Sequence, residues 1–181
     1  MIVPSDKIAQ PVHYTGGGNA VLAVDSLDAR LLTLFAHEPR IGVLEASRRL
    51  VVARGTVQAR LDRLERSGVV RSWGPDLDPR ALGYPVTAFV TLEIRQGGGH
   101  DPVGEHLAQI PEVIEAHTIT GPGDLWCRVV AKSNTDLQRV LDTVVSYPGI
   151  ERSATVITLA TQVEPRMLPL LSVALPPPPQ N

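Results

Sequence analysis

The spacing of apolar residues changes once along this chain of 181 residues, and the change limits the folds that the chain can adopt. Between residues 25 and 72, apolar residues recur every three to four positions, which is the period of an amphipathic helix. From Val86 to Ile94, apolar residues alternate with their neighbours, which is the period of a half-buried strand. We therefore expect a helical unit followed by a unit that is built on a sheet.

Three short helices are predicted in the helical unit, at residues 27–36, 43–50 and 54–66. Ser67-Gly68 ends the third helix, because glycine readily takes the left-handed conformation that closes a helix. A short strand is predicted after it, at residues 69–73. Three helices with a tight second connection are typical of a helix-turn-helix, here of the winged type.

The sheet unit is predicted to follow the β-α-β-β-α-β order of ferredoxin-like domains, which makes the chain an α+β protein. After the strand at residues 86–94, one helix starts at Asp101-Pro102 and another opens at Ser133, with Asp136 three residues on. The remaining predicted strands are residues 113–120, 124–131 and 150–160.

One face of such a sheet is covered by helices, and the other face needs a different cover. Phe89, Trp126 and Ile157 are predicted on that second face. An uncovered apolar face favours association of subunits, and the arm or tail of the same chain is the alternative cover. We expect at least a dimer.

Turn-forming residues divide the chain into segments. Gly74 to Pro85 is rich in turn formers, which predicts a hinge, and the two ends show no sustained period. The predicted segments are a flexible arm at 1–24, the helix-turn-helix domain at 25–72, the hinge at 73–85, the ferredoxin-like domain at 86–166 and a tail at 167–181.

The net charge of −2 hides an uneven distribution. Residues 25–72 carry nine Lys/Arg and six Asp/Glu, a net of +3, whereas residues 86–166 carry six and ten, a net of −4. A basic first half suits a DNA-binding module joined to an acidic sensor, and chance asymmetry is the alternative. With no long apolar run, no signal peptide and a single cysteine, Cys127, the chain is expected to be cytoplasmic.

The third predicted helix is the candidate DNA-reading element. On a helical wheel, Val57, Leu61 and Leu64 share one side of it, while polar and basic residues occupy the other. A recognition helix needs this division, because one face packs and the other enters the major groove. Arg can bind guanine or phosphate, Gln can bind adenine, and Ala or Thr can contact a thymine methyl group. The candidate DNA-binding residues are Arg48, Arg49, Arg54, Thr56, Gln58, Ala59, Arg60 and Arg63, of which Arg48 and Arg49 are better placed for phosphates.

At this point the sequence resembles the leucine-responsive/asparagine-regulator (Lrp/AsnC) family of transcriptional regulators. The resemblance covers about residues 25–165. In the recognition helix and after it, the matching residues are Thr56-Val57-Gln58, Arg60-Leu61, Arg63-Leu64-Glu65 and Ser67-Gly68-Val69-Val70. Elsewhere they are Leu27-Asp28, Leu77-Asp78-Pro79, Leu82-Gly83-Tyr84, and Thr120-Gly121 followed by Asp124.

The resemblance implies a sequence-specific regulator of transcription that binds double-stranded DNA and responds to an amino acid or related metabolite. In the family that effector binds in the C-terminal domain, at contacts between dimers, so tetramers or octamers of chains are also expected. Glycines let backbone approach a ligand, free amides can bind a carboxylate, and Asp124 can accept bonds from an ammonium group. The candidate ligand-binding residues are Thr120, Gly121, Gly123 and Asp124, with Ser153 and Thr155 on the last strand. A plain hairpin turn is the alternative.

Two residues depart from the family pattern in the helix-turn-helix. Val51 stands where the family usually has Gly, and Ala53 stands where it usually has a capping Ser. Valine tolerates positive φ poorly, and the loss of a cap weakens a helix start. A different helix start, capped by Thr56, is therefore one prediction, and the departures bear on DNA affinity.

Several features of the sequence bear on classes of function other than a regulator. The five histidines show no metal-ligand spacing, and the chain has no phosphate-binding loop or nucleophile elbow, so neither an enzyme nor a metal or cofactor site is expected. The alternative interpretation of residues 54–66 is that they form a solvated basic helix with ion pairs such as Asp62–Arg66 and not a recognition helix. An architectural DNA-binding protein of the same fold, with weak specificity, is the other alternative, and the specificity ratio would separate it from a regulator.

Overall fold

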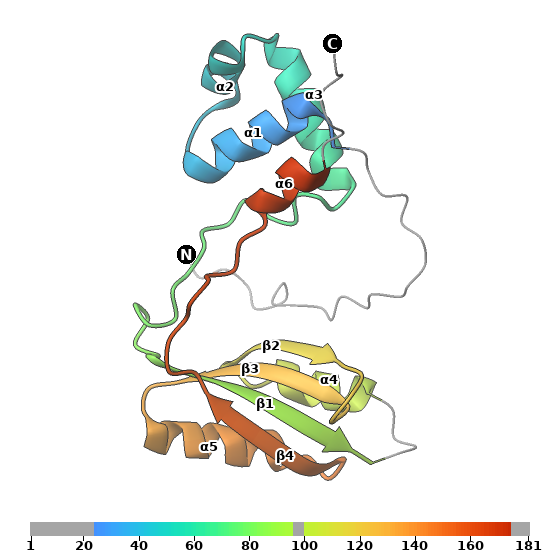
Figure 1. Ribbon diagram of the computed structural model, residues 1–181, viewed down its shortest axis with the longest axis vertical. Coiled ribbons are helices and arrows are strands. Elements are labelled where there is room, and N and C mark those ends of the chain that lie inside the picture. Colours follow the sequence, from blue (N-terminus) through green and yellow to red (C-terminus); the bar gives the residue numbers. More distant parts are fainter. Residues whose placement is uncertain (1–23, 96–99, 175–181) are drawn as a thin grey trace, which may run out of the picture. The chain divides into compact units, whose positions relative to one another are not determined.

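The computed structural model describes residues 24–95 and 100–174 (Figure 1). Among these residues, backbone contacts separate two compact units, one made of residues 24–75 and 163–174 and the other of residues 76–162. Residues 1–23 of the predicted arm and the proline-rich end of the predicted tail lie outside the described residues. None of the described helices has the length and apolar character that a membrane crossing requires.

The first unit contains the three expected helices, α1 (Ser26–His37), α2 (Val43–Leu50) and α3 (Arg54–Arg66). The bounds of α2 and α3 agree with the prediction, and α1 is one residue longer at each end. Apolar side chains from all three helices form one core, consisting of Leu31, Phe35, Ala46, Leu50, Val57 and Leu61. Non-directional apolar contacts of this kind hold the three helices together.

The strand predicted at residues 69–73 is wrong: these residues form no strand in the described structure. Gly68 takes a φ of +75°, and the Val70 N–H then donates to the Leu64 carbonyl oxygen at 3.1 Å, which closes α3. The Trp73 ring packs edge-on against Phe35, with 5.3 Å between ring centroids. A side-chain contact therefore holds this segment where a ladder of strand hydrogen bonds was expected.

A further helix, α6 (Leu168–Ala174), was not predicted; the segment was expected to be part of a tail. It contacts α1 and belongs to the same compact unit as the helix-turn-helix. Leu168 and Leu171, three residues apart, are its half-buried positions. The chain thus returns to the first unit after completing the second.

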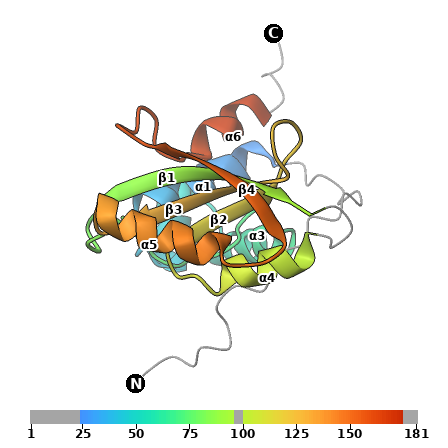
Figure 2. The ribbon, with the colours of Figure 1, turned by 90° about the horizontal axis from the view of Figure 1, so that it is seen from below.

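The second unit has the expected ferredoxin-like order, with the four strands arranged β2-β3-β1-β4, all antiparallel. The strands are β1 (Val86–Ile94), β2 (Val113–Thr118), β3 (Leu125–Ala131) and β4 (Ile150–Ile157). Helices α4 (Asp101–Ala108) and α5 (Asn134–Val145) both cover the same face of the sheet (Figure 2). As expected, Ser133 caps α5, accepting from the Asp136 N–H at 3.1 Å.

Side chains alternate between the two faces of this sheet. Val90, Leu92 and Cys127 lie in the core under the helices, and burial raises the pKa of the Cys127 thiol to about 11. On the opposite face Phe89 and Trp126 stack, with their ring centroids 4.9 Å apart.

The prediction for Ile157 is wrong. Ile157 pairs directly with Ala88, whose side chain is buried in the helix-covered core, and directly opposed residues share a face. Ile157 is therefore on the helix side of edge strand β4 and not with Phe89 and Trp126.

Candidate DNA-binding and ligand-binding sites

The turn between α2 and α3 is built on a strained residue. Val51 follows α2 in the left-handed conformation, with φ 57° and ψ 50°, and its side chain is 87% exposed. This conformation lets the Val52 N–H donate to the Ser47 carbonyl oxygen at 3.0 Å. Helix α3 starts at Arg54, with Ala53 as an N-cap that provides no side-chain bond, so the alternative start capped by Thr56 is wrong.

The first turns of α3 present a polar surface. Arg54, Thr56, Gln58 and Ala59 are exposed, while Val57 on the other side is fully buried. Arg54 and Thr56 make no side-chain hydrogen bond within residues 24–95 and 100–174, so both have donors available for a partner. The burial of Val57 and the exposure of Thr56 and Ala59 agree with the predicted helical wheel.

The Asp62 side chain does not form the pair with the Arg66 side chain that the alternative interpretation of this helix assumes. Its carboxylate accepts from the Gln58 side-chain amide at 2.7 Å, while the Arg66 Nε donates to the Asp62 backbone carbonyl at 3.1 Å. The Gln58 side chain is therefore held along the helix axis by this bond.

Arg48 and Arg49 are exposed on α2 and pair with acidic neighbours. Arg48 lies 3.6 Å and Arg49 3.5 Å from Glu45, and Arg49 also pairs with Glu38. The Glu38 carboxylate, and to a lesser degree Glu45, raises the pKa of Arg49. Exposed pairs of this kind contribute about 0–1 kcal/mol, so a phosphate can replace the carboxylates at little cost.

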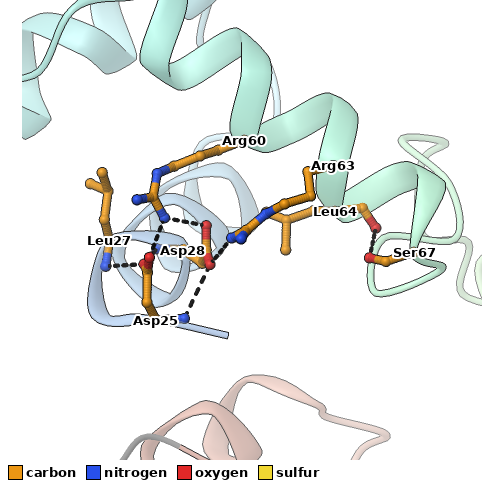
Figure 3. A network of polar contacts seen from close by, with 7 residues as sticks. All are labelled: Asp25, Leu27, Asp28, Arg60, Arg63, Leu64 and Ser67. Atoms are coloured by element: carbon orange, nitrogen blue, oxygen red, sulfur yellow. Dashed lines mark hydrogen bonds and ion pairs between the residues drawn. The ribbon is translucent and has the colours of Figure 1, made fainter. Parts of the chain in front are cut away.

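Arg60 and Arg63 are directed toward α1, as Figure 3 shows. The Asp28 side chain has no exposed surface; its Oδ1 accepts from Arg60 Nη1 at 2.8 Å and its Oδ2 accepts from Arg63 Nη2. Arg60 also donates to the Asp25 carboxylate at 2.5 Å. Two arginines of α3 are thus bound to two aspartates at the start of α1.

The aspartates are fixed by the helix start itself. Asp25 is the N-cap of α1 and accepts from the N–H groups of Leu27 and Asp28, both at 2.9 Å. Asp28 in turn accepts from the Asp25 N–H at 3.1 Å, which completes a capping box. The hydrogen bond from Arg60 is the main cause that lowers the pKa of Asp25, and Asp25 and Asp28 raise the pKa of Arg60.

A comparison of free energies indicates whether Arg60 and Arg63 can leave Asp28 to contact a DNA base. A good bidentate contact to a base is worth about 1–3 kcal/mol, whereas removing a partner from a buried carboxylate costs about 3–5 kcal/mol. Because the arginines are partly exposed, the cost lies near the lower end of that range. The balance keeps both side chains on Asp28. The sequence contained the capping-box spacing of Asp25 and Asp28, but not their distant arginine partners.

The candidate ligand loop is anchored to the end of β1. Gly121 and Gly123 have φ of +118° and +110°. A Cβ on Gly123 would overlap the Thr91 side chain and lie 3.2 Å from the Leu92 carbonyl oxygen, so only glycine fits there. The Asp124 N–H donates to that same carbonyl at 2.8 Å, and its Oδ2 accepts from the Ile94 N–H at 2.8 Å.

The two hydroxyl residues lie across β1 from the loop. Ser153 and Thr155, both exposed on β4, pair with Leu92 and Val90 respectively. Leu92 therefore has Asp124 on one side and Ser153 on the other, and Thr155 lies two residues along the strand. Thr120 and Gly121 are exposed at the tip of the loop.

Comparison with known proteins assigns each of the two units to a known domain family. Residues 24–65 match the model of the AsnC-type helix-turn-helix domain, and residues 87–168 match the model of the Lrp/AsnC ligand-binding domain. The chain belongs to the Lrp/AsnC family. As a member of this family it is a DNA-binding regulator of transcription, in a family of regulators and not of enzymes.

Individual Lrp/AsnC proteins resemble the chain over most of its length. An HTH-type transcriptional regulator of Pyrococcus horikoshii is 30% identical over 147 residues, which is 81% of this chain and 97% of that relative. The structure of E. coli AsnC is similar with a TM-score of 0.74 at 23% identity, covering 81% of this chain and 99% of AsnC. The feast or famine regulatory protein of M. tuberculosis, in complex with L-methionine, has a TM-score of 0.71 at 26% identity and covers 80% and 98%.

Proposed function

We propose that this regulator reads specific DNA through the exposed face of α3, and that an amino acid or related metabolite bound to the sheet unit changes its DNA affinity. One observation supports the DNA-reading face above all others. The first turns of α3 expose Arg54, Thr56, Gln58 and Ala59, while Val57 on the same turns is fully buried.

Each exposed residue has a role that its chemistry supports. Arg54 donates to guanine and Gln58 to adenine, while Ala59 and the Thr56 methyl group contact thymine. Arg48 and Arg49, on the preceding helix, bind phosphates. Arg60 and Arg63 lie on the same helix but are held on Asp28, so they are not assigned to base contacts.

Substitution of Arg54 tests the reading face. Arg54→Ala is expected to weaken binding to a duplex selected by the wild-type protein by about 1–3 kcal/mol, and Gln58→Ala by a similar amount. Fluorescence anisotropy at fixed salt measures both.

Arg95→Ala is the matched control for Arg54→Ala, because Arg95 is exposed on the sheet unit and pairs only at the surface with Glu151. It removes the same charge and should leave affinity unchanged. If both reading-face variants bind as tightly as the wild type, α3 is not the reading element. If the wild type binds selected and scrambled duplexes equally, the protein is architectural.

The ligand proposal rests on the anchored loop. A similar regulator binds L-methionine, according to its structure. Here Asp124 uses Oδ2 to hold the Ile94 N–H, and among the described residues its Oδ1 has no partner, which suits an ammonium group. The Ser153 and Thr155 hydroxyls provide further hydrogen bonds. No cofactor is part of the proposal.

Two substitutions of Asp124 separate ligand binding from loop anchoring. Asp124→Asn keeps an acceptor for the Ile94 N–H but removes the charge, whereas Asp124→Ala removes both. We expect amino acids, L-methionine first among them, to raise the Tm of the wild type and not that of Asp124→Asn, whose ligand-free Tm stays near wild type. Asp124→Ala should lower the ligand-free Tm as well.

DNA must change ligand affinity by the same factor by which the ligand changes DNA affinity. Titrations of the wild type with L-methionine, with and without the selected duplex, measure that factor. An Asp124→Asn variant that responds fully would place the site elsewhere, and a wild type that binds no amino acid would make the regulator ligand-independent.

A further inference from the structure

We propose that Asp28 is a positioning residue for DNA recognition, which fixes the rotation of α3 about its own axis by holding Arg60 and Arg63. This role rests on the proposed function, in which the exposed face of α3 reads DNA. It assigns Arg60 and Arg63 to orienting the helix and not to contacting bases.

The apolar side of α3 cannot set this rotation alone. Val57, Leu61 and Leu64 are buried, but apolar contacts are non-directional and tolerate small rotations of a helix. A binding constellation, however, needs its groups held within about 0.5 Å and 10–20° of the productive geometry. A directional contact is therefore needed beside the apolar one.

Arg60 and Arg63 provide that contact. They are three residues apart on α3; on a helical wheel Arg60 lies beside the buried stripe, and Arg63 lies next to Thr56 on the exposed side. Both donate to the same carboxylate, Arg60 to Oδ1 and Arg63 to Oδ2, as Figure 3 shows. Two side chains that are hydrogen-bonded at neighbouring turns oppose rotation of α3 in either direction.

Asp28 is itself held in place by its surroundings. Asp28 has no exposed surface and sits in the first turn of α1, where the capping box and the helix dipole hold a carboxylate in place. The pairing also balances charge, with Arg60 and Arg63 against Asp25 and Asp28. Their contribution to attraction of phosphates is therefore small compared with that of Arg54, which makes no ion pair among the residues that the structure describes.

A double-mutant cycle on the full chain tests the proposal. The probes are a duplex selected by the wild type from a random library and a scrambled duplex of the same composition. Asp28→Asn and Arg63→Gln should each reduce the affinity ratio between the two probes by about fivefold or more. The double variant should be no worse than either single variant, because both remove the same constraint.

Salt dependence distinguishes positioning from contact. Arg63→Gln should leave both the affinity for the scrambled duplex and the salt slope unchanged, since no phosphate contact is lost. The matched control Arg54→Gln has the same charge change on the exposed face, and it should add to the loss caused by Asp28→Asn. Where Arg54 contacts a phosphate, its loss also lowers the slope by about 0.9.

Arg60→Lys and Arg63→Lys control for a failure of the other variants to fold, because they keep the positive charge at Asp28 and lose only the guanidinium group that can donate two parallel hydrogen bonds. They should lower the affinity ratio at an unchanged salt slope, and circular dichroism confirms that they are folded. Additive losses in the cycle, a reduced slope for Arg63→Gln, or an unchanged ratio for both lysine variants would each overturn the proposal. A wild type without any preferred duplex would refute the proposed function, and this role with it.

Discussion

Val51 takes a backbone conformation that its side chain disfavours. The left-handed region costs a residue with a Cβ about 1–2 kcal/mol, and a β-branched residue there is a clear outlier. The side chain is almost fully exposed and recovers nothing by burial. The turn is maintained because α2 and α3 are packed on both sides of it.

Val51→Gly is therefore expected to raise the free energy of unfolding. Relief of the strain outweighs the entropy that glycine loses on folding, about 0.5–1 kcal/mol, so the net gain is about 0.5–1 kcal/mol. Urea denaturation measures it. The control is Val52→Gly, which removes a half-buried side chain from the same turn and should lower the free energy of unfolding. A Val51→Gly variant that is less stable than the wild type would show that the Val51 backbone is not strained.

The sequence could locate some of these residues but not their partners. The position of Val51 was visible because the family pattern has glycine there, and the exposed face of α3 followed from a wheel. The bonds of Arg60 and Arg63 were not visible, because a wheel gives the direction of a Cβ and not the end of a long side chain. Asp28 is also more than thirty residues away in sequence.

Among the elements, those with local signals were predicted best. The bounds of α2 and α3 follow from apolar spacing and end residues, and β1 follows from strict alternation. Strand formation at residues 69–73 needs a neighbouring strand, which no local pattern guarantees. The face of Ile157 depends on its register with Ala88, and apolar character alone does not fix a register.

The start of α1 predicts how the protein responds to acid. Because Arg60 lowers the pKa of Asp25, this group stabilises the fold above its ordinary pKa, and that stability is lost as pH falls through the lower folded value. The expected window lies below about pH 4. Asp25→Asn keeps a capping oxygen but does not titrate, so its unfolding free energy should fall less between pH 5 and pH 3 in urea titrations. Equal losses in wild type and variant would exclude Asp25 as a contributor.

For the whole molecule, the stacked Phe89 and Trp126 side chains predict a dimer through the face of the sheet opposite α4 and α5. Light scattering should give at least twice the chain mass of 19.5 kDa, and Trp126→Glu should weaken the assembly. A symmetric dimer should bind a pseudo-palindrome with half-sites about 34 Å apart, or a multiple of that.

Ile157→Glu is the matched control, since Ile157 lies on the other face of the same sheet, and it should keep the mass of the wild type. A mass equal to one chain at micromolar concentration would count decisively against the dimer.

The chain joins its two units at two places, because it leaves the helix-turn-helix unit after Pro75 and re-enters it at Val163. The segment between Ile157 and Leu168 has about ten residues and reaches at most about 40 Å when fully extended. While α6 stays on α1, the end of β4 cannot move further than that from α6. The C-terminal segment is therefore a second covalent connection between the two units, beside the one at residues 74–85.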